Sequence, residues 1–285
     1  MIIDAHQHLW TSGYAWLQEP ALAPIRRDYT VADLRAVIGP AGVDRTVLVE
    51  AGSCDTAETH LFLRTARDTP EIAGVVGWAS LLDPELAGTI DGYRAAPGGH
   101  LLVGIRDQVQ GRGDDFLDRG PVRAGLATVA AAGLVNELVV RAAQLPSVAR
   151  AAAALPESTF VLDHLGKPGI AAGGLRRWRE LITPVAARPN VVAKLSGLVT
   201  EAAWATWTPR DLKPYVDIAV DLFGAGRLMF GSDWPVLELA ATYAEVQDAM
   251  TGLLGGAPAD APRSSVVALR RWRRPGRTPK SDRSC

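Results

Sequence analysis

The chain has 285 residues, of which 48% are hydrophobic and 21% are charged, and its formal net charge is −1. This length and apolar content suit one large α/β barrel better than two small domains. The near-neutral charge gives no field that would attract nucleic acid or a membrane surface. The two cysteines, Cys54 and Cys285, exclude a disulfide framework and agree with a reducing compartment. Without a long apolar run or a signal peptide, we expect a cytoplasmic protein that does not enter a membrane.

Short apolar runs alternate with longer segments of helical periodicity along the chain. Runs rich in Val, Leu and Ile predict parallel strands that are buried on both faces. They span residues 1–9, 45–52, 72–80, 101–108, 135–142, 159–166, 190–197 and 227–235. The segments with helical spacing are 30–42, 55–68, 83–96, 120–133, 145–156, 175–187, 210–224 and 243–256.

This alternation of eight strands and eight helices predicts a (β/α)8 TIM barrel. A doubly wound open sheet is the alternative, and such a sheet usually carries a glycine-rich phosphate loop after its first strand. Here the sequence DAHQHLW stands at that place. The sequence therefore favours the barrel.

Polar side chains gather at the ends of the predicted strands, where the active residues of a barrel lie. His6 and His8 are two residues apart, so a strand aims both imidazoles at one point, although they could also be ordinary strand histidines. The complete set of candidates is His6, His8, Glu50, Trp78, Arg106, Asp107, Arg141, Asp163, His164, Lys167, Lys194, Ser196, Ser232, Asp233 and Trp234.

Five motifs carry a resemblance to a known family: DAHQHLW, LVGIR, FVLDHLGKP, NVVAKLSGL and RLMFGSDWP. They resemble the amidohydrolase superfamily and, within its amidohydrolase 2 group, the branch of sugar lactonases and dicarboxylate lactonases. The resemblance covers residues 1–255 and implies a barrel with H-x-H on the first strand and an Asp on the eighth.

The resemblance also bears on metal binding. Metal-binding relatives add ligands from the fifth and sixth strands, but NELVVRA offers neither His nor Lys, so a two-metal site lacks its bridging ligand. His6, His8, His164 and Asp233 remain, and they are sufficient for one zinc-like divalent ion. A site that requires no metal stays open, because lactonases that resemble this chain work without one.

The residues and the resemblance together predict a hydrolase that opens a small polar lactone of the sugar-acid class. Asp233 is the expected base for the attacking water, and His164 and Arg106 are expected to stabilise the oxyanion, with His6 or His8 as further donors. The alternative is a mononuclear metal-dependent decarboxylase or amidohydrolase on the same barrel. A non-catalytic binding barrel is a third function, against which the retained His and Asp residues argue.

Further residues are candidates for substrate binding. We expect His6, His8, Arg141 and Lys194 to contact substrate, although ion pairing is an equal explanation for Arg141 and Lys194. Tryptophans suit the CH faces of sugars, and Trp10, Trp204 and Trp207 are expected at a substrate-facing rim, together with Trp16 and Trp234; loop packing is the alternative. The expected partner is a small molecule and not nucleic acid, and a homo-oligomer stays open.

The end of the chain does not follow the family pattern. We predict that residues 1–255 form one barrel domain and that 256–285 are an atypical basic tail. From Arg263 onward there are seven Arg and one Lys against one Asp. The sequence favours a frameshift, since codons open to residues 269–272 allow a shifted frame to read Phe-Gly-Gly, the turn that the family places there. A genuine basic, disordered tail is the alternative.

Overall fold

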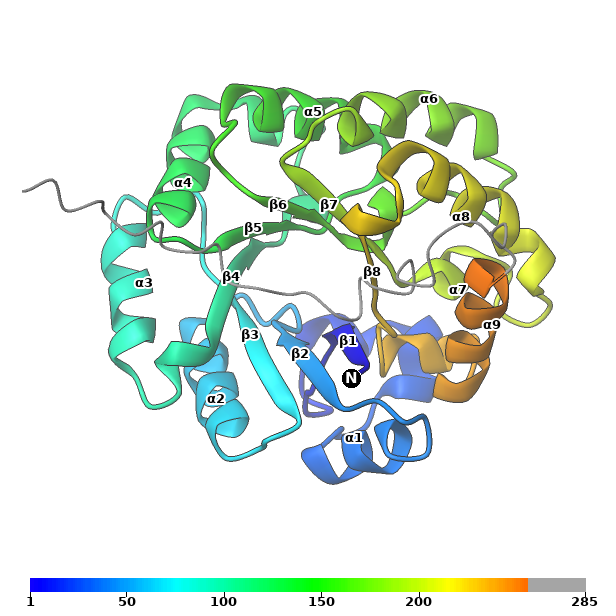
Figure 1. The fold of residues 1–285 in the computed structure, drawn as a ribbon. Helices are drawn as coiled ribbons and strands as arrows, with labels where there is room; N and C mark the ends of the chain where they lie inside the picture. Colours follow the sequence, from blue (N-terminus) through cyan, green and yellow to red (C-terminus); the bar gives the residue numbers. More distant parts are fainter. Residues whose placement is uncertain (256–285) are drawn as a thin grey trace, which may run out of the picture.

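Eight parallel strands form one sheet in the order in which they follow along the chain (Figure 1). The computed structural model describes residues 1–255, so the predicted basic tail, residues 256–285, lies outside the described residues. A parallel bridge between Gln7 and Trp234 joins the first strand to the segment after the last. The predicted (β/α)8 barrel is confirmed. The strands are β1 (Ile3–Gln7), β2 (Arg45–Val49), β3 (Ile72–Trp78), β4 (Leu102–Asp107), β5 (Val135–Leu138), β6 (Phe160–Leu162), β7 (Val191–Leu195) and β8 (Leu228–Phe230).

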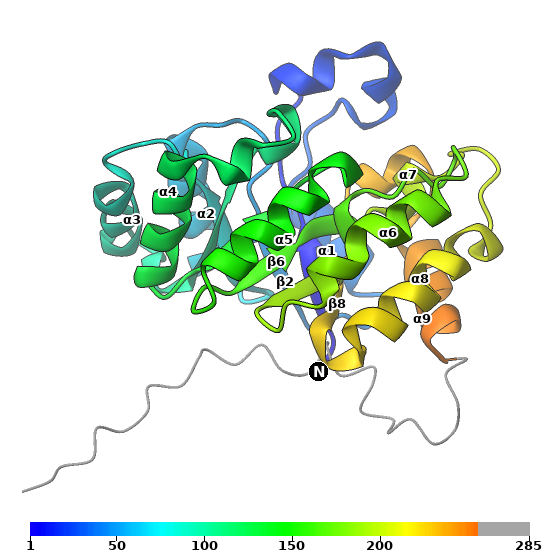
Figure 2. The same ribbon diagram turned by 90° about the horizontal axis from the view of Figure 1, so that it is seen from above.

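Helices surround the strands and connect each one to the next (Figure 1). Each of the eight predicted helical segments overlaps one helix of the structure, whereas the short α7 (Leu198–Glu201) has no predicted counterpart. Two 3-10 segments, η1 (Ala15–Gln18) and η2 (Pro20–Ile25), project beyond one end of the barrel (blue in Figure 2). The other helices are α1 (Val31–Ile38), α2 (Thr56–Arg67), α3 (Leu86–Ala95), α4 (Gly120–Ala131), α5 (Leu145–Ala154), α6 (Leu175–Ala186), α8 (Pro209–Phe223) and α9 (Tyr243–Gly255).

Local sequence explains where several helices begin. Thr30 and Asp33 form a capping box at the start of α1, as Thr208 does with Asp211 at the start of α8. In each box the side chain of one residue binds the backbone N–H of the other, which satisfies donors that the first helical turn leaves free. Proline occupies the first turn of α4, α5 and α8, where its missing N–H costs nothing.

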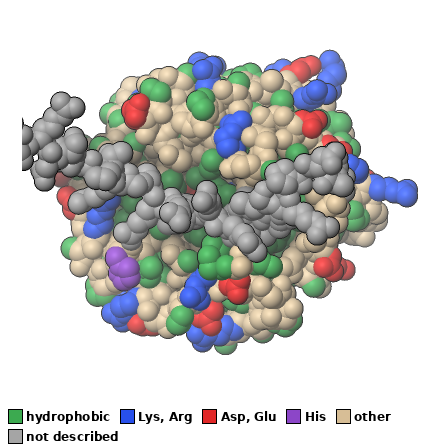
Figure 3. All heavy atoms as spheres, viewed as in Figure 1, with side chains coloured by type: hydrophobic (Ala, Val, Ile, Leu, Met, Phe, Trp, Pro, Cys, Tyr) green, Lys and Arg blue, Asp and Glu red, His purple; other side chains and the backbone are tan. Residues whose placement is uncertain are grey.

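Apolar side chains pack between the barrel and its helices. Leu48, Val75, Leu126 and Trp178 belong to one continuous buried cluster. Helix α4 approaches the loop after β3 so closely that a Cβ at Gly125 would lie 2.2 Å from the carbonyl oxygen of Leu81. On the face seen in Figure 3, basic and acidic side chains are interspersed around the edge. Within residues 1–255, none of the helices has the length and apolar character needed to cross a bilayer.

The seam between β1 and β8 places the first and last motifs side by side. The backbone N–H of His8 donates to the carbonyl oxygen of Trp234 (2.8 Å), and that of Asp233 donates to His6 (2.9 Å). Asp4 supports the seam, because its Oδ1 accepts from the backbone N–H groups of His6 (3.0 Å) and Ser232 (2.9 Å). Barrel closure therefore holds the two N-terminal histidines against Asp233.

Candidate active site

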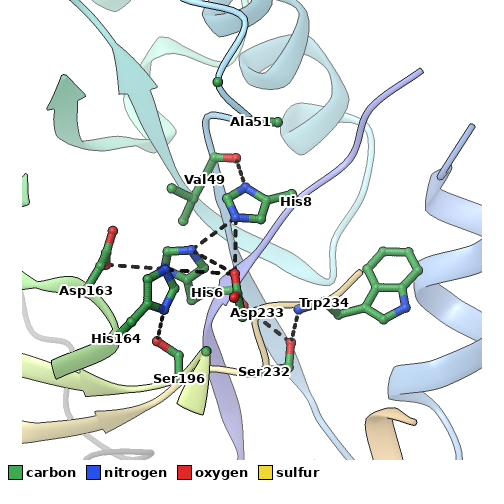
Figure 4. A network of polar contacts seen from close by, with 12 residues as sticks. His6, His8, Val49, Ala51, Asp163, His164, Ser196, Ser232, Asp233 and Trp234 are labelled. Carbon is green, nitrogen blue, oxygen red and sulfur yellow. Dashed lines mark hydrogen bonds and ion pairs between the residues drawn. The ribbon is translucent and has the colours of Figure 1, made fainter. Parts of the chain in front are cut away.

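The two histidines of the H-x-H motif face each other at the end of β1 (Figure 4). Their Nε2 atoms are 3.1 Å apart, and both rings are buried. The Nδ1 atom of His8 lies 2.9 Å from the carbonyl oxygen of Val49. Since a carbonyl only accepts, this Nδ1 carries a proton and donates it to Val49.

Asp233 completes a compact group with these rings. Its Oδ1 lies 3.6 Å from His6 Nε2 and 3.5 Å from His8 Nε2, and 4.0 Å from His164 Nε2. Burial acts to raise the pKa of Asp233, but the imidazoles of His164, His8 and His6 outweigh it and hold the pKa below its usual range. The carboxylate is therefore ionised at neutral pH and available as a base.

His164 follows β6 and is fixed by the end of β7. Its Nδ1 lies 2.8 Å from the hydroxyl oxygen of Ser196. Burial lowers the pKa of His164 to about 4, so the ring is neutral at physiological pH. Gly197 is required beside it, because its φ is +62° and a Cβ there would lie 2.6 Å from His164 Nδ1.

Left-handed backbone conformations are concentrated at the same site. His164, Leu165, Gly166 and Lys167 all have φ between 51° and 70°, and Asp233 has φ of 62°. For residues other than glycine this region costs about 1–2 kcal/mol each. The indole N–H of Trp178 donates to the carbonyl oxygen of Leu165 (2.9 Å), one of the contacts that hold the turn. The backbone at His164 and Asp233 is therefore strained, and the surrounding contacts stabilise it in this conformation.

Arg106, at the end of β4, is surrounded by acceptors below the histidines. Its Nε donates to Glu50 Oε1 (2.5 Å), its Nη2 to the Glu50 carbonyl oxygen (2.6 Å) and its Nη1 to Asp163 Oδ2 (2.9 Å). The same Nη1 is 3.5 Å from His6 Nε2. Most N–H donors of Arg106 are thus already hydrogen-bonded within the protein, so few remain to stabilise an oxyanion.

Lys194 on β7 is the second buried cation. Its Nζ lies 2.6 Å from Glu137 Oε2, 3.2 Å from Asp163 Oδ1 and 3.1 Å from His6 Nδ1. Burial raises the pKa of Glu137 to about 7, with Asp163 acting in the same direction. Asp163 behaves oppositely: burial acts to raise its pKa, but Lys194, His6 and Arg106 hold it well below the usual range.

Glu137 is the part of this cluster that the sequence analysis missed. It lies in NELVVRA, the segment of the fifth strand that has neither His nor Lys. The available signal was a carboxylate inside a predicted buried strand, since a buried charge requires a partner.

The site provides ligand atoms suitable for a divalent metal ion. Donor atoms of His6, His8 and Asp233 lie within 4.8 Å of one another, and so do those of a second group, His6, Asp163 and His164. Ligands of a tetrahedral zinc ion stand about 3.3 Å apart. The separations of 3.1, 3.5 and 3.6 Å in the first group are close to this value. Two imidazoles and a carboxylate with an open fourth position therefore fit a catalytic-type ion.

The remaining candidates lie away from this cluster. Arg141 is exposed, and its guanidinium binds the Gln110 carbonyl oxygen (2.9 Å) and Asp114 Oδ1 (3.1 Å). Trp204 and Trp207 line a groove on the outside of the barrel, against α8 and α9. Their contact with substrate stays a prediction, to which the structure adds no support.

The other tryptophans of the expected rim are packed within the protein. Trp10 is buried and stacks edge-on against Trp16 and Tyr29 at centroid distances of 5.2 Å. Its indole N–H has no hydrogen-bond partner among residues 1–255. Trp234 is also buried, and its indole N–H donates to Glu238 (2.9 Å).

The paired histidines at the end of β1 and the Asp after β8 lie at the carboxyl ends of the strands, where the active residues of a (β/α)8 barrel enzyme are found. Residues 3–263 match the profile of the Amidohydrolase family (Amidohydro_2), and the chain belongs to this family. The predicted resemblance is confirmed.

Similar proteins of known name come from two Burkholderia species. An L-fucono-1,5-lactonase of Burkholderia multivorans is 38% identical over 258 residues, which are 86% of this chain and 85% of that protein. An L-fucono-1,5-lactonase of Burkholderia ambifaria is 36% identical over 85% and 83% of the two chains. A crystal structure of a Burkholderia multivorans amidohydrolase with bound zinc superposes with a TM-score of 0.86 at 36% identity, covering 93% of this chain.

Proposed function

We propose that this protein hydrolyses lactones of sugar acids, with L-fucono-1,5-lactone as the first substrate to test. The observation that carries the proposal is an ionised carboxylate, Asp233, among the imidazoles of three buried histidines. The names of the two Burkholderia relatives support the same substrate class. This function agrees with the lactone hydrolysis expected from the sequence.

The chemistry requires one base and several donors. Asp233 accepts a proton from water as the water oxygen bonds to the lactone carbonyl carbon, and the carbonyl electron pair moves onto its oxygen. Ring N–H groups of the histidines stabilise this oxyanion. When the oxyanion collapses, the ring C–O bond breaks, and the proton on Asp233 passes to the leaving alkoxide oxygen. The product is an open-chain hydroxy acid.

The charges of the site favour a neutral lactone over a dicarboxylate. A dicarboxylate would need cations that are free to bind it. Arg106 already pairs with Glu50 and Asp163, and Lys194 pairs with Glu137. The two cations of this buried cluster are therefore occupied, whereas the polar atoms around them suit sugar hydroxyls.

A metal ion is a compatible addition to this site. His6, His8 and Asp233 would hold it, and a bound divalent ion would polarise the lactone carbonyl as a Lewis acid. The alternative of a metal-dependent decarboxylase or amide hydrolase has less support. Structures of decarboxylases share only 14–15% identity with this chain, so they show the fold alone.

Two further proposals concern the location of the protein and the kind of molecule that it binds. We propose a cytoplasmic location, because two cysteines without a disulfide framework agree with a reducing compartment. We also propose that the enzyme acts on a small molecule without nucleic acid.

Asp233→Asn tests the catalytic assignment. We expect turnover of a panel of sugar lactones, followed with a pH indicator, to fall by at least about 10³-fold, because an amide cannot accept the proton of water. Asp91→Asn, on the exposed side of α3, is the matched control and should retain wild-type rates. Circular dichroism verifies that both variants are folded. Near-normal turnover by Asp233→Asn would refute the assignment of the base.

A further inference from the structure

Lys167 and Glu201 form a partly exposed pair beside the buried cluster. Lys167 ends the left-handed turn that begins at His164, and Glu201 is the last residue of α7, which begins directly after Gly197. A Cβ at Gly197 would lie 2.6 Å from His164 Nδ1 and 3.1 Å from Asp233 Oδ2, so α7 starts between these two residues. Both members of the pair therefore follow closely along the chain from residues at the cluster.

Electrostatic effects between the pair and the cluster agree with this placement. Burial raises the pKa of Glu201, while Lys167 opposes this shift and Asp233 adds to it. Lys167 also acts to lower the pKa of His164. Charges act on a pKa in this way only when they are near one another. The pair is therefore close enough for a ligand bound at Asp233 to reach it.

The polar atoms of this pair are available to a ligand. Lys167 Nζ lies 4.0 Å from Glu201 Oε1, which is longer than a hydrogen bond. The ammonium group and the carboxyl group have no hydrogen-bond partner among residues 1–255. Arg106 and Lys194 of the cluster instead have carboxylate partners at 2.5–2.9 Å. Lys167 is therefore a cation near the site whose N–H donors are not already used.

A hydroxyl oxygen fits between the two groups of the pair. It would donate to the carboxyl group and accept from the ammonium group, at about 2.7–2.9 Å from each. Because the groups are 4.0 Å apart, the angle at the hydroxyl oxygen is then roughly 90°, so both hydrogen bonds can form together. A carboxylate or phosphate of a ligand would be repelled by Glu201. The pair therefore suits a neutral hydroxyl group better than an anion.

We propose that Lys167 and Glu201 form a subsite for a hydroxyl group of the lactone ring, which favours hydroxylated sugar lactones over plain lactones. This subsite deepens the proposed function and rests on it for the identity of the ligand. A salt bridge that only stabilises the turn after β6 is the other explanation of the pair. Such a salt bridge would affect the stability of the protein and not its affinity for substrate.

Glu201→Gln and Lys167→Met test the subsite through KM. A contact with a hydroxyl away from the reacting carbonyl is equally strong in the ground state and the transition state, so its loss raises KM and leaves kcat unchanged. We expect KM for L-fucono-1,5-lactone to rise at least about tenfold in each variant, with kcat within about twofold of wild type, because each variant loses a hydrogen bond to a charged group. δ-Valerolactone has the same six-membered ring without hydroxyls, and its rate of hydrolysis should not change.

Lys213→Met and Asp217→Asn are the matched controls. Lys213 Nζ pairs with Asp217 Oδ2 at 2.7 Å on the exposed side of α8. Each control also removes one charge of a lysine–carboxylate pair, but it should keep the wild-type KM. Unchanged KM values in Glu201→Gln and Lys167→Met would overturn the subsite, and so would a fall in kcat without a rise in KM.

Binding of L-fucose separates the subsite from the proposed function. This sugar has hydroxyls on a six-membered ring and no ester, so its binding does not depend on turnover. Ligand-observed NMR with the full chain should give a Kd at least about tenfold higher in Glu201→Gln and Lys167→Met than in the wild type. That result without turnover of any sugar lactone would refute the proposed function and leave the subsite standing. Equal Kd values would overturn the subsite even if lactones are hydrolysed, and a wild type that neither binds L-fucose nor hydrolyses sugar lactones would refute both.

Discussion

At the scale of single residues, Ser196 orients the His164 ring, and a substitution at this position tests that role. Its hydroxyl holds His164 Nδ1 at 2.8 Å, and Gly197 leaves no side chain to take over this role. In Ser196→Ala we expect kcat/KM for a sugar lactone to fall about 10–100-fold, since partners of this kind orient the ring that does the chemistry. Steady-state kinetics with the indicator assay provides the measurement.

Ser147→Ala is the matched control for Ser196→Ala. Ser147 lies on α5 and is also buried, but its hydroxyl donates to the carbonyl oxygen of Gln144 (2.7 Å), outside the cluster. Both variants should lose about 1 kcal/mol of unfolding free energy. If both also lost activity equally, the orienting role of Ser196 would be wrong.

At the scale of elements, the joint between β1 and β8 depends on Asp4. This buried carboxylate accepts from the backbone N–H groups of His6 and Ser232 and from the hydroxyl of Tyr243 on α9 (2.9 Å). Asp4→Ala leaves both backbone donors unsatisfied, so we expect a loss of about 2–4 kcal/mol. For a chain of this size the loss lowers Tm by about 5–10 °C, measured by calorimetry.

Tyr243→Phe is a milder change at the same joint, and its loss of Tm is compared with that of Asp4→Ala. It removes one hydrogen bond to Asp4 and leaves the two backbone donors paired, so Tm should fall by only about 2–4 °C. Equal Tm values for Asp4→Ala and the wild type would show that the seam does not depend on this carboxylate.

The sequence predicted some elements better than others for physical reasons. The strands and helices follow hydrophobic periodicity, which is a local signal. The left-handed turn over residues 164–167 was not predictable in this way. Three of its residues, His164, Leu165 and Lys167, are not glycine, whereas a positive φ is expected from a sequence mainly at glycine. Tertiary contacts impose this turn, among them the bond from Trp178 to Leu165.

At the scale of the whole molecule, the fold was predictable because eight alternations admit few architectures. The membership of the polar cluster was only partly predictable. His6, His8, His164 and Asp233 follow from the rule that active residues end strands, and the structure brings them together. The pairing of Lys194 with Glu137 joins strands that are not neighbours in the sheet, and only barrel closure places the two side chains together.

Metal removal tests whether the lactonase activity of the whole molecule requires a bound ion. The cluster has ligand atoms for zinc, yet Asp233 is an ionised base that can accept a proton from water without an ion. An ester also needs less activation than an amide, because an alkoxide leaves more easily than an amine. We therefore expect dialysis against a chelator, with metal content checked by mass spectrometry, to leave most lactonase activity in place. A loss of more than about tenfold that added zinc restores would instead identify a mononuclear metal enzyme, with the ion held by His6, His8 and Asp233.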